Sequence, residues 1–278
     1  MTVSPPALTA IQLEDLAGVA TGVLADSEPI FHRGIGAAAA VTKGAKDYAT
    51  EVDLELERTI GAALTEHTGY RVFGEEFGGA DFDGDEPIWV IDPIDGTANY
   101  MHSSPMCGMN CALVLRGESL IGLTWLPLLG QRYLAVNGRL VRRNGEPLPR
   151  RTPARLAEVM VGVGNPQGNS ELFPTGFRLA LLDELLRKAF RVRLLGSAAL
   201  DLAWVASGEY GATVQFTGHP WDFAPGDCLV RAVGGTTSLL SGEAFHLRGG
   251  SMLAAAPGVA DEIADVVAGL GDPAGYRD

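Results

Sequence analysis

Apolar side chains repeat at helical spacing in two stretches near the start of the chain. Between residues 7 and 25, and again from Val52 to about His67, they recur every three to four positions. This spacing places them on one face of a helix, which can then pack against a sheet. We therefore expect two amphipathic helices, with Asp47 and Thr50 as candidate caps at the start of the second.

Short apolar runs bounded by turn-forming residues follow these helices, and such runs are typical of strands. The expected strands are 70–73, 88–91, 106–115, 119–126, 131–136 and 139–142. The last two flank Asn137 and Gly138, a dipeptide that favours a tight hairpin turn. The later runs predict an antiparallel sheet backed by the two helices.

From residue 151 onward, strand and helix patterns alternate, which favours a more α/β-like sheet. Strands are expected at 159–163 and 192–195, and helices near 177–188, over 196–208 and from Asp222. Asp222 is expected to cap the last helix, with Pro225 tolerated in its first turn. The basic, proline-rich stretch 147–153 is the expected boundary. We therefore predict an α+β or α/β chain with two subdomains, residues 1–150 and 151–278.

Composition is compatible with a large folded core, since the 278 residues include 46% hydrophobic residues and 36 glycines. The chain contains no apolar run of the roughly 20 residues needed to span a bilayer, and its start lacks the basic and apolar regions of a signal peptide. We expect a cytoplasmic protein without membrane association. Cys107, Cys111 and Cys228 lack metal-finger spacing and are expected to be buried apolar residues.

The net charge of −13 and the pI near 4.8 argue against a nucleic-acid partner. Binding to a phosphate backbone normally demands a basic surface. An acidic enzyme with an anionic substrate instead needs a local positive charge, which bound Mg²⁺ could supply.

Candidate chemistry concentrates in WVIDPIDGTANY, residues 89–100. Asp92 is expected at the end of a buried strand, with Pro93 ending the strand's pairing and Asp95 opening a turn. Two carboxylates held three residues apart repel each other unless a cation lies between them. Mg²⁺ prefers such oxygen ligands, and the backbone carbonyl of Ile94 can add another. A bare DxxD pattern would more often be a solvated turn, so the specificity lies in the full string.

The string DPIDGTANY resembles the DPIDGT(T/K)NF signature of the inositol monophosphatase family, which are Mg²⁺-dependent, lithium-sensitive sugar-phosphate phosphatases. Three further pieces match this family in its own order: DxxTxxD at Asp47, Thr50 and Asp53, GEE at 74–76, and WDFAPG at 221–226, which is similar to WDxAAG. The resemblance spans nearly the whole chain and implies a layered αβαβα sandwich of two subdomains. GEEFGG, GSAALDLA and the length favour the inositol-1-monophosphatase branch.

The resemblance implies metal ligands and catalytic groups at matching positions. The implied metal ligands are Glu75, Asp92, Asp95, Asp222 and the backbone carbonyl of Ile94. Thr97 and Asp53 would orient or deprotonate the attacking water, with Glu75 also in contact with it. We therefore expect direct attack by water and no phosphorylated enzyme.

Substrate contacts would come from both halves of the chain. The implied contacts are Asp95, Gly96, Thr97, Gly196, Ser197, Ala198, Gln215 and Asp222. The N–H groups of Gly96 and Thr97 would hold the phosphate. Those of 196–198, where strand passes to helix, could bond an anion or a substrate hydroxyl, and simple helix capping is an equal alternative.

One position departs from the family pattern. Seven residues before Asp222, where many inositol monophosphatases place a Glu against the inositol hydroxyls, this chain has Gln215. An amide accepts hydrogen bonds less strongly than a carboxylate, so the alcohol half of the substrate stays open. Fructose 1,6-bisphosphate, histidinol phosphate and 3′-phosphoadenosine phosphates are alternatives, as is a mainly regulatory binding protein. The resemblance also implies a homodimer.

Overall fold

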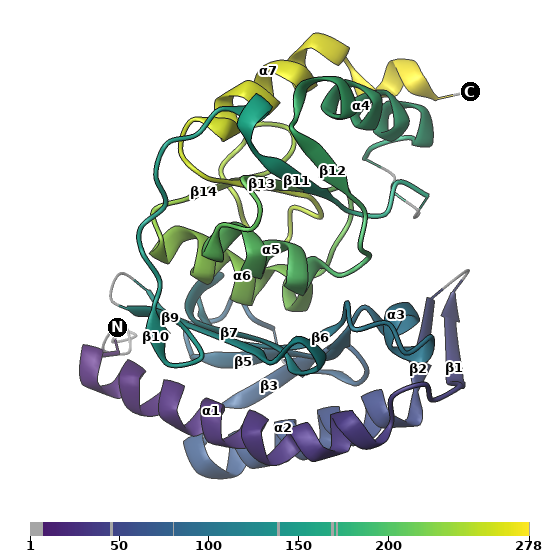
Figure 1. Cartoon of the computed structure of the whole chain (residues 1–278). Coiled ribbons are helices and arrows are strands. Elements are labelled where there is room, and N and C mark those ends of the chain that lie inside the picture. Colours follow the sequence, from purple (N-terminus) through teal and green to yellow (C-terminus); the bar gives the residue numbers. More distant parts are fainter. Residues whose placement is uncertain are drawn as a thin grey trace.

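Two helices cover the outer face of the larger sheet, as the apolar spacing predicts. The computed structural model describes residues 8–44, 47–79, 81–137, 140–167, 170 and 172–277. Helix α1 (Ala10–Arg33) and helix α2 (Glu51–Thr68) lie side by side on this face (Figure 1). Thr50 is the N-cap of α2, and its hydroxyl accepts a hydrogen bond from Val52 N. The side chain of Asp47, the other candidate cap, lies outside the described part.

Helix α1 continues past its predicted end at residue 25 and runs through Pro29. Proline usually interrupts a helix because it lacks an N–H and clashes with the carbonyl four residues earlier. Pro29 lies on the exposed side, where that carbonyl can meet water. Beyond it, the Phe31 ring packs against Tyr100 with centroids 4.9 Å apart, and Tyr100 Oη donates to the Phe31 carbonyl. Tertiary contacts therefore hold the last turn.

Eight strands form the larger sheet, in the order β10-β9-β8-β7-β6-β5-β3-β4. They are β3 Arg71–Gly74, β4 Gly78–Gly79, β5 Ile88–Asp95, β6 Gly108–Leu115, β7 Glu118–Leu126, β8 Gln131–Val136, β9 Leu140–Arg143 and β10 Glu146–Pro147. Neighbouring strands are antiparallel except β3 and β5, which are parallel. The predicted antiparallel sheet is thus confirmed, with one parallel pair. Gly138 in the predicted hairpin turn lies outside the described residues.

Strand β5 is longer than predicted, because its pairing with β6 resumes after Pro93. Asp92 pairs with Asn110, the register is then irregular, and Asp95 pairs with Gly108. Proline has no N–H to donate, so the ladder opens at Pro93 and closes again at Asp95. The prediction that Pro93 ends the strand is therefore wrong, and one strand carries both Asp92 and Asp95.

A small two-stranded sheet beside the larger one was not predicted. It consists of β1 (Ala39–Gly44) and β2 (Asp47–Thr50), which pair antiparallel. Strand β1 is exposed along its whole length, so it carries no alternation of apolar and polar residues that could reveal it. The short helix α3 (Thr97–Met101) follows β5 and contacts β2 (Figure 1).

Helices α5 (Ala198–Ser207) and α6 (Pro220–Ala232) form a layer between two sheets (Figure 1). Beyond it lie a five-stranded sheet, in the order β12-β11-β13-β15-β14, and the outer helices α4 (Thr175–Lys188) and α7 (Val259–Leu270). The remaining elements are β11 Met160–Val163, β12 Arg191–Arg193, β13 Ala212–Gln215, β14 Thr236–Ser238, β15 Met252–Ala255 and 3₁₀ helices at Pro127–Leu129, Leu156–Glu158 and Pro273–Tyr276. These five layers are the predicted αβαβα sandwich.

Helix α6 begins before Asp222, so the prediction that Asp222 is its N-cap is wrong. His219 is the N-cap and Pro220 is the first helical residue, where a missing N–H costs nothing. Asp222 caps the helix from within, since its Oδ2 accepts from His219 N at 2.6 Å. Pro225 therefore lies deeper in the helix than expected. It leaves a carbonyl free one turn earlier, and Asn110 of β6 donates to this carbonyl at 3.3 Å.

The three cysteines are buried and unpaired, as predicted. Cys107 and Cys111 belong to the core between the larger sheet and α1 and α2, and Cys228 to the core around α5 and α6. Within the described ranges, no helix is long and apolar enough to cross a bilayer.

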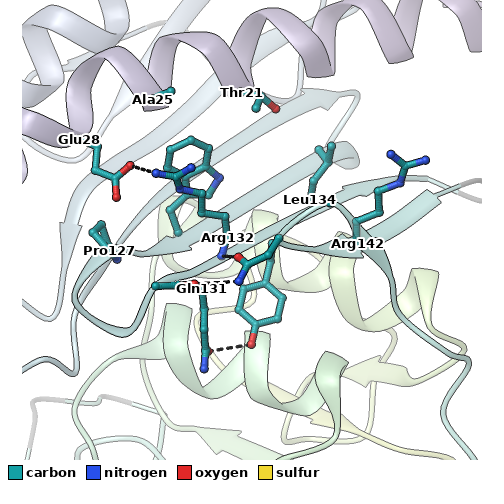
Figure 2. A pocket seen from close by; sticks show the side chains of 13 residues that line it. Thr21, Ala25, Glu28, Pro127, Gln131, Arg132, Leu134 and Arg142 are labelled. Carbon is teal, nitrogen blue, oxygen red and sulfur yellow. Dashed lines mark hydrogen bonds and ion pairs between the residues drawn. The ribbon is translucent and has the colours of Figure 1, made fainter.

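A cavity of about 630 Å³ opens between α1 and strands β7 and β8 (Figure 2). Thr21, Ala25 and Glu28 line it from the helix, and Arg132 reaches across it from β8. Arg132 pairs with Glu28, and its guanidinium lies 4.6 Å from the centre of the Trp125 ring. The charges of Glu28 and Arg132 thus neutralise each other, while Arg142 adds a further positive charge to the lining. The lining includes none of the predicted site residues.

Candidate metal and phosphate site

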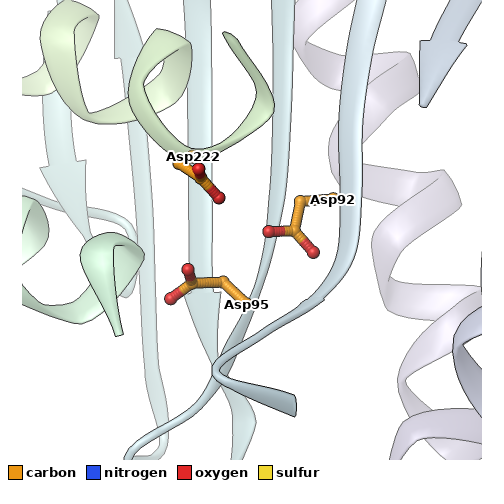
Figure 3. Close-up of side chains that lie close together, drawn as sticks. All are labelled: Asp92, Asp95 and Asp222. Atoms are coloured by element: carbon orange, nitrogen blue, oxygen red, sulfur yellow. The ribbon is translucent and has the colours of Figure 1, made fainter. Parts of the chain in front are cut away.

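Three predicted metal ligands converge where β5 ends beneath the first turn of α6. Asp92 and Asp95 come from β5 and Asp222 from α6, and their carboxylates point toward one another (Figure 3). One oxygen from each lies within 4.8 Å of the other two. Asp92 and Asp95 are buried, and Asp222 is half-buried.

Backbone groups hold each of these carboxylates in place. Asp92 Oδ1 accepts from Ile94 N at 3.0 Å, across the open part of the β5 ladder. Asp95 Oδ2 accepts from Ala199 N at 3.0 Å and from the hydroxyl of Ser197, the N-cap of α5. Because His219 is the N-cap of α6, the N-terminal turns of α5 and α6 hold Asp95 and Asp222 respectively.

The three carboxylates form no ion pair with a Lys, Arg or His in the part of the chain that the structure describes. Burial raises the pKa of Asp92 well above its usual range, and the negative charges of Glu75, Asp95 and Asp222 raise it further. Burial and the charge of Asp95 likewise raise the pKa of Asp222. Burial raises the pKa of Asp95 to about 6, against the opposing hydrogen bonds from Ser197 and Ala199.

This donor set fits a hard divalent cation. Mg²⁺ takes oxygen ligands at about 2.1 Å, so two ligand oxygens on opposite sides of one ion lie about 4.2 Å apart. Oxygens within 4.8 Å of one another need only small side-chain rotations to meet that geometry. A cation there would also remove the mutual repulsion that raises these pKa values.

Glu75 lies beside this triad, in the turn that follows β3. A hydrogen bond with Glu75 contributes to the raised pKa of Asp92, which places the two side chains in contact. On its other side, Glu75 accepts from Lys43 Nζ at 2.7 Å, and Glu76 accepts from the same ammonium at 2.7 Å. Burial lowers the pKa of Lys43, but the two glutamates raise it more, so Lys43 stays charged. Lys43 of β1 therefore partly neutralises the negative charge of the turn that carries Glu75 and Glu76.

Sequence reasoning missed Lys43 and also Glu57, which shapes the turn that carries Glu75. Glu57 of α2 accepts from Glu76 N at 2.7 Å and from Phe77 N at 2.9 Å. A side chain at Gly74 would come within 2.1 Å of the Glu57 carboxylate. The available signal was the spacing of Asp53 and Glu57, which places two acids on one helix face. Lys43 left no such signal, because its partners lie far along the chain.

The predicted catalytic pair, Thr97 and Asp53, also comes together. Thr97 Oγ1 lies 3.4 Å from Asp53 Oδ1 and 3.1 Å from the carbonyl oxygen of Ile94. Asp53 Oδ2 accepts from Thr50 N at 2.8 Å, so the capping box of α2 fixes the Asp53 carboxylate. Burial raises the pKa of Asp53, while the hydrogen bonds from Thr50 lower it.

The two expected substrate loops are joined by Asn99. Gly96 has the left-handed φ of 83°, and a β-carbon there would lie 3.0 Å from the Met106 carbonyl oxygen. Asn99 Nδ2 donates at 2.7 Å both to this carbonyl and to that of Leu195, which directly precedes Gly196. The loops at 96–97 and 196–198 thus lie side by side.

The expected substrate contacts of the second loop are partly engaged within the protein. The Ser197 hydroxyl and the Ala199 N–H bind Asp95, and a backbone hydrogen bond from Ala198 also lowers the pKa of Asp95. Gln215 is buried at the end of β13, with Nε2 donating to Thr213 and Asp201. Of the expected contacts in the second half, Asp222 is the one that belongs to the triad.

Comparisons with known proteins point in one direction. The inositol monophosphatase family model matches residues 9–269. A Mycobacterium tuberculosis protein named probable inositol 1-monophosphatase ImpA is 42% identical over 258 residues, which cover 92% of this chain and 95% of the relative. A Mycolicibacterium smegmatis protein named inositol-1-monophosphatase ImpA is 41% identical over 266 residues, which cover 95% of this chain and 96% of that relative.

Solved structures share the fold. One described as an IMPase/NADP phosphatase complexed with Mg²⁺ and phosphate matches with a TM-score of 0.82, covering 94% of this chain and 97% of that one. Its sequence identity to this chain is 19%, so the likeness concerns the fold.

Proposed function

The chain belongs to the inositol monophosphatase family, and we propose that it is a Mg²⁺-dependent phosphomonoesterase that hydrolyses inositol 1-phosphate to inositol and phosphate. The observation that carries this proposal is the convergence of Asp92, Asp95 and Asp222 without a cationic side chain among the described residues. The substrate follows from relatives of above 40% identity over nearly their whole length that are named for this activity.

Asp92, Asp95, Asp222, Glu75 and the Ile94 carbonyl would hold the metal. Bound Mg²⁺ would neutralise phosphate oxygens, lower the pKa of water and stabilise the leaving alkoxide. Lys43 pairs with Glu75 through Oε1 and with Glu76, so Glu75 would offer Oε2 to the metal or exchange the ammonium for the ion.

Asp53 and Thr97 would orient the attacking water. The Thr97 hydroxyl can donate to Asp53 Oδ1 while its oxygen accepts a hydrogen bond from water, which gives the water a defined direction of attack. Asp53 can take the proton that water loses, since it lies within hydrogen-bond reach of Thr97 and is fixed by Thr50. Attack in this arrangement requires no protein nucleophile.

The remaining groups would bind the substrate on either side of the ester bond. Gly96 and Thr97 would hold the phosphate with their N–H groups at the start of α3. Gly196, Ser197 and Ala198 would border the alcohol, and Gln215 would face its hydroxyls. Asp95 and Asp222 would contact the substrate as well as the metal.

We also propose three properties of the whole protein. Residues 1–150 and 151–278 would be subdomains, which is supported by strand membership, since the larger sheet draws only on the first range and the smaller only on the second. A cytoplasmic location is supported by three unpaired, buried cysteines. A homodimer is an expectation from the family, and light scattering that gives a monomer at micromolar concentration would contradict it.

The test is Mg²⁺-dependent phosphate release from inositol 1-phosphate, fructose 1,6-bisphosphate, histidinol phosphate and 3′-phosphoadenosine 5′-phosphate, with Asp92→Asn as the inactive control. A preference for inositol 1-phosphate supports the proposal. Preference for another ester keeps the metal site and replaces the substrate. Turnover of none of them by the folded protein would contradict the phosphatase assignment and favour a regulatory binding protein.

A further inference from the structure

A buried polar cluster, formed by Asp201, Thr213 and Gln215, lies one helical turn away from the groups that hold Asp95. Asp201 sits in the first turn of α5, whose start binds Asp95, and Thr213 and Gln215 lie on β13. All three residues are at least 96% buried, with exposed fractions of 1%, 0% and 4%. We call them the Asp201 cluster.

In the Asp201 cluster, Gln215 and Thr213 donate hydrogen bonds and Asp201 accepts them. Gln215 Nε2 donates to Asp201 Oδ2 at 2.9 Å and to Thr213 Oγ1 at 2.8 Å, which uses both of its N–H groups. Thr213 Oγ1 in turn donates to Asp201 Oδ2 at 3.4 Å. Among the described residues, nothing donates to Gln215 Oε1. The amide nitrogen is therefore saturated, and the carbonyl oxygen is free.

Gly162 in β11 and Gly164 directly after it have no side chains, which leaves space for the side chains of Asp201 and Gln215. A β-carbon at Gly164 would lie 2.3 Å from Gln215 Oε1, and one at Gly162 would lie 3.0 Å from Asp201 Oδ1. Gly162 pairs with Thr213 across the parallel strands β11 and β13, so the glycines lie next to the cluster. Any larger residue at position 164 would displace the amide carbonyl.

Asp201 can act as an acceptor here whether or not it carries a proton. Burial raises the pKa of Asp201 to about 8, although the hydrogen bonds from Gln215 and Thr213 lower it. Since Oδ2 already faces two donors, a proton belongs on Oδ1, which has no partner within the described residues. Rotating the Gln215 amide by half a turn would set its carbonyl against Oδ2 and leave Nε2 without these acceptors.

We propose that Asp201 is a positioning residue for substrate selectivity, which holds the Gln215 amide so that its carbonyl oxygen accepts a hydrogen bond from a hydroxyl of the substrate alcohol. This inference rests on the proposed function, in which Gln215 faces the alcohol. It also gives a reason for the amide at this position. A Glu there would place a second carboxyl group about 2.9 Å from Asp201, whereas Gln offers an acceptor to the substrate and a donor to Asp201.

The test compares two esters that differ in their alcohol. Inositol 1-phosphate carries ring hydroxyls, and p-nitrophenyl phosphate carries none. For Asp201→Leu we expect the ratio of kcat/KM between the inositol and aryl esters to fall about fivefold, as for the loss of one neutral hydrogen bond. The change should appear in KM for the inositol ester, and aryl ester hydrolysis should be retained. Asp201→Asn keeps an amide oxygen as the acceptor and is expected to keep the wild-type ratio.

Two further variants complete the test. Gln215→Leu should lower the same ratio, and the Asp201→Leu, Gln215→Leu double variant should lose no more selectivity than Gln215→Leu alone, because the two residues act through one hydrogen bond. Thr213→Val, which is close in shape, removes the other acceptor and should lower the ratio in the same direction even if Asp201→Leu fails to fold.

The outcomes separate this inference from the proposed function. Loss of selectivity in Gln215→Leu but not in Asp201→Leu or Thr213→Val overturns the positioning role and leaves the function intact. Equal losses on both esters, or losses that add in the double variant, also overturn it. A wild-type enzyme without preference for the inositol ester contradicts the proposed substrate, and this inference with it.

Discussion

Replacing Asp92 by Asn should make the metal-free protein more stable than wild type, and Mg²⁺ should reverse this order of stability. Among the three carboxylates, Asp92 is the cleanest to change, because its Oδ1 accepts from Ile94 N and an amide oxygen can accept the same bond. The new amide nitrogen can donate to the neighbouring Glu75. In the absence of metal, the substitution removes one buried acid from a cluster of like charges.

The magnitude follows from the distances. Two unit charges about 4.8 Å apart repel by about 3 kcal/mol at an effective dielectric constant of about 20. The raised pKa values of Asp92 and Asp222 show that protonation relieves part of this repulsion. We therefore expect metal-free Asp92→Asn to be about 1–3 kcal/mol more stable than metal-free wild type, or about 3–10 °C higher in Tm.

Saturating Mg²⁺ should invert this order. At a thousandfold excess over Kd, a ligand stabilises the folded state by about 4.1 kcal/mol, and the variant should gain far less because it has lost a charged ligand. The assay is thermal unfolding of both proteins in EDTA and across a Mg²⁺ titration, with phosphate release measured in parallel. An equal Mg²⁺-induced rise in Tm for both proteins, or a less stable variant in EDTA, would refute the metal site.

Three other outcomes are expected. Asp201→Asn should become more stable relative to wild type as the pH rises from about 4 to about 8. The reason is that the pKa of Asp201 is about 8 in the folded protein and 3.8 in the unfolded chain. Between these pH values the unfolded wild type loses a proton that the folded protein keeps, which lowers the free energy of unfolding of wild type by an amount on the order of 5 kcal/mol. A pH-independent difference in urea unfolding would contradict this. Thr97→Val should lower kcat about a hundredfold while keeping the Mg²⁺-induced rise in Tm, because it removes the hydroxyl between Asp53 and Ile94; unchanged turnover would remove Thr97 from catalysis. Gln215→Glu should change selectivity among phosphate esters more than it changes overall rate, and equal effects on every ester tested would show that Gln215 does not face the alcohol.

Sequence patterns predicted most elements of the first 150 residues that have a buried face, whereas α7, β13 and β15 are also buried and were not predicted. The apolar spacing of α2 and the capping by Thr50 were visible because both are local properties. The extension of α1 through Pro29 was not, since it depends on the contact between Phe31 and Tyr100. Similarly, β1 is exposed and carried no pattern.

The site shows the same division between local and distant information. The proximity of Asp92 to Asp95 follows from their separation of three residues, but no spacing places Asp222 beside them, and only the family resemblance suggested it. The hydrogen bonds from Lys43 to Glu75, and those joining Asp201 to Gln215, were missed because each connects segments that periodicity treats separately. Long-range partners of this kind emerge only from the folded chain.

The position of α6 between the two sheets bears on how the protein is made. Its apolar face packs against the larger sheet, and its first turn carries Asp222, yet it is synthesised after all strands of that sheet. On the ribosome, the strands β3–β10 can therefore emerge with Asp92 and Asp95 already in place but with one face of their sheet uncovered. The nascent chain cannot bring Asp92, Asp95 and Asp222 together until residue 222 has left the exit tunnel, so it should remain inactive and dependent on protection from aggregation until synthesis is nearly finished.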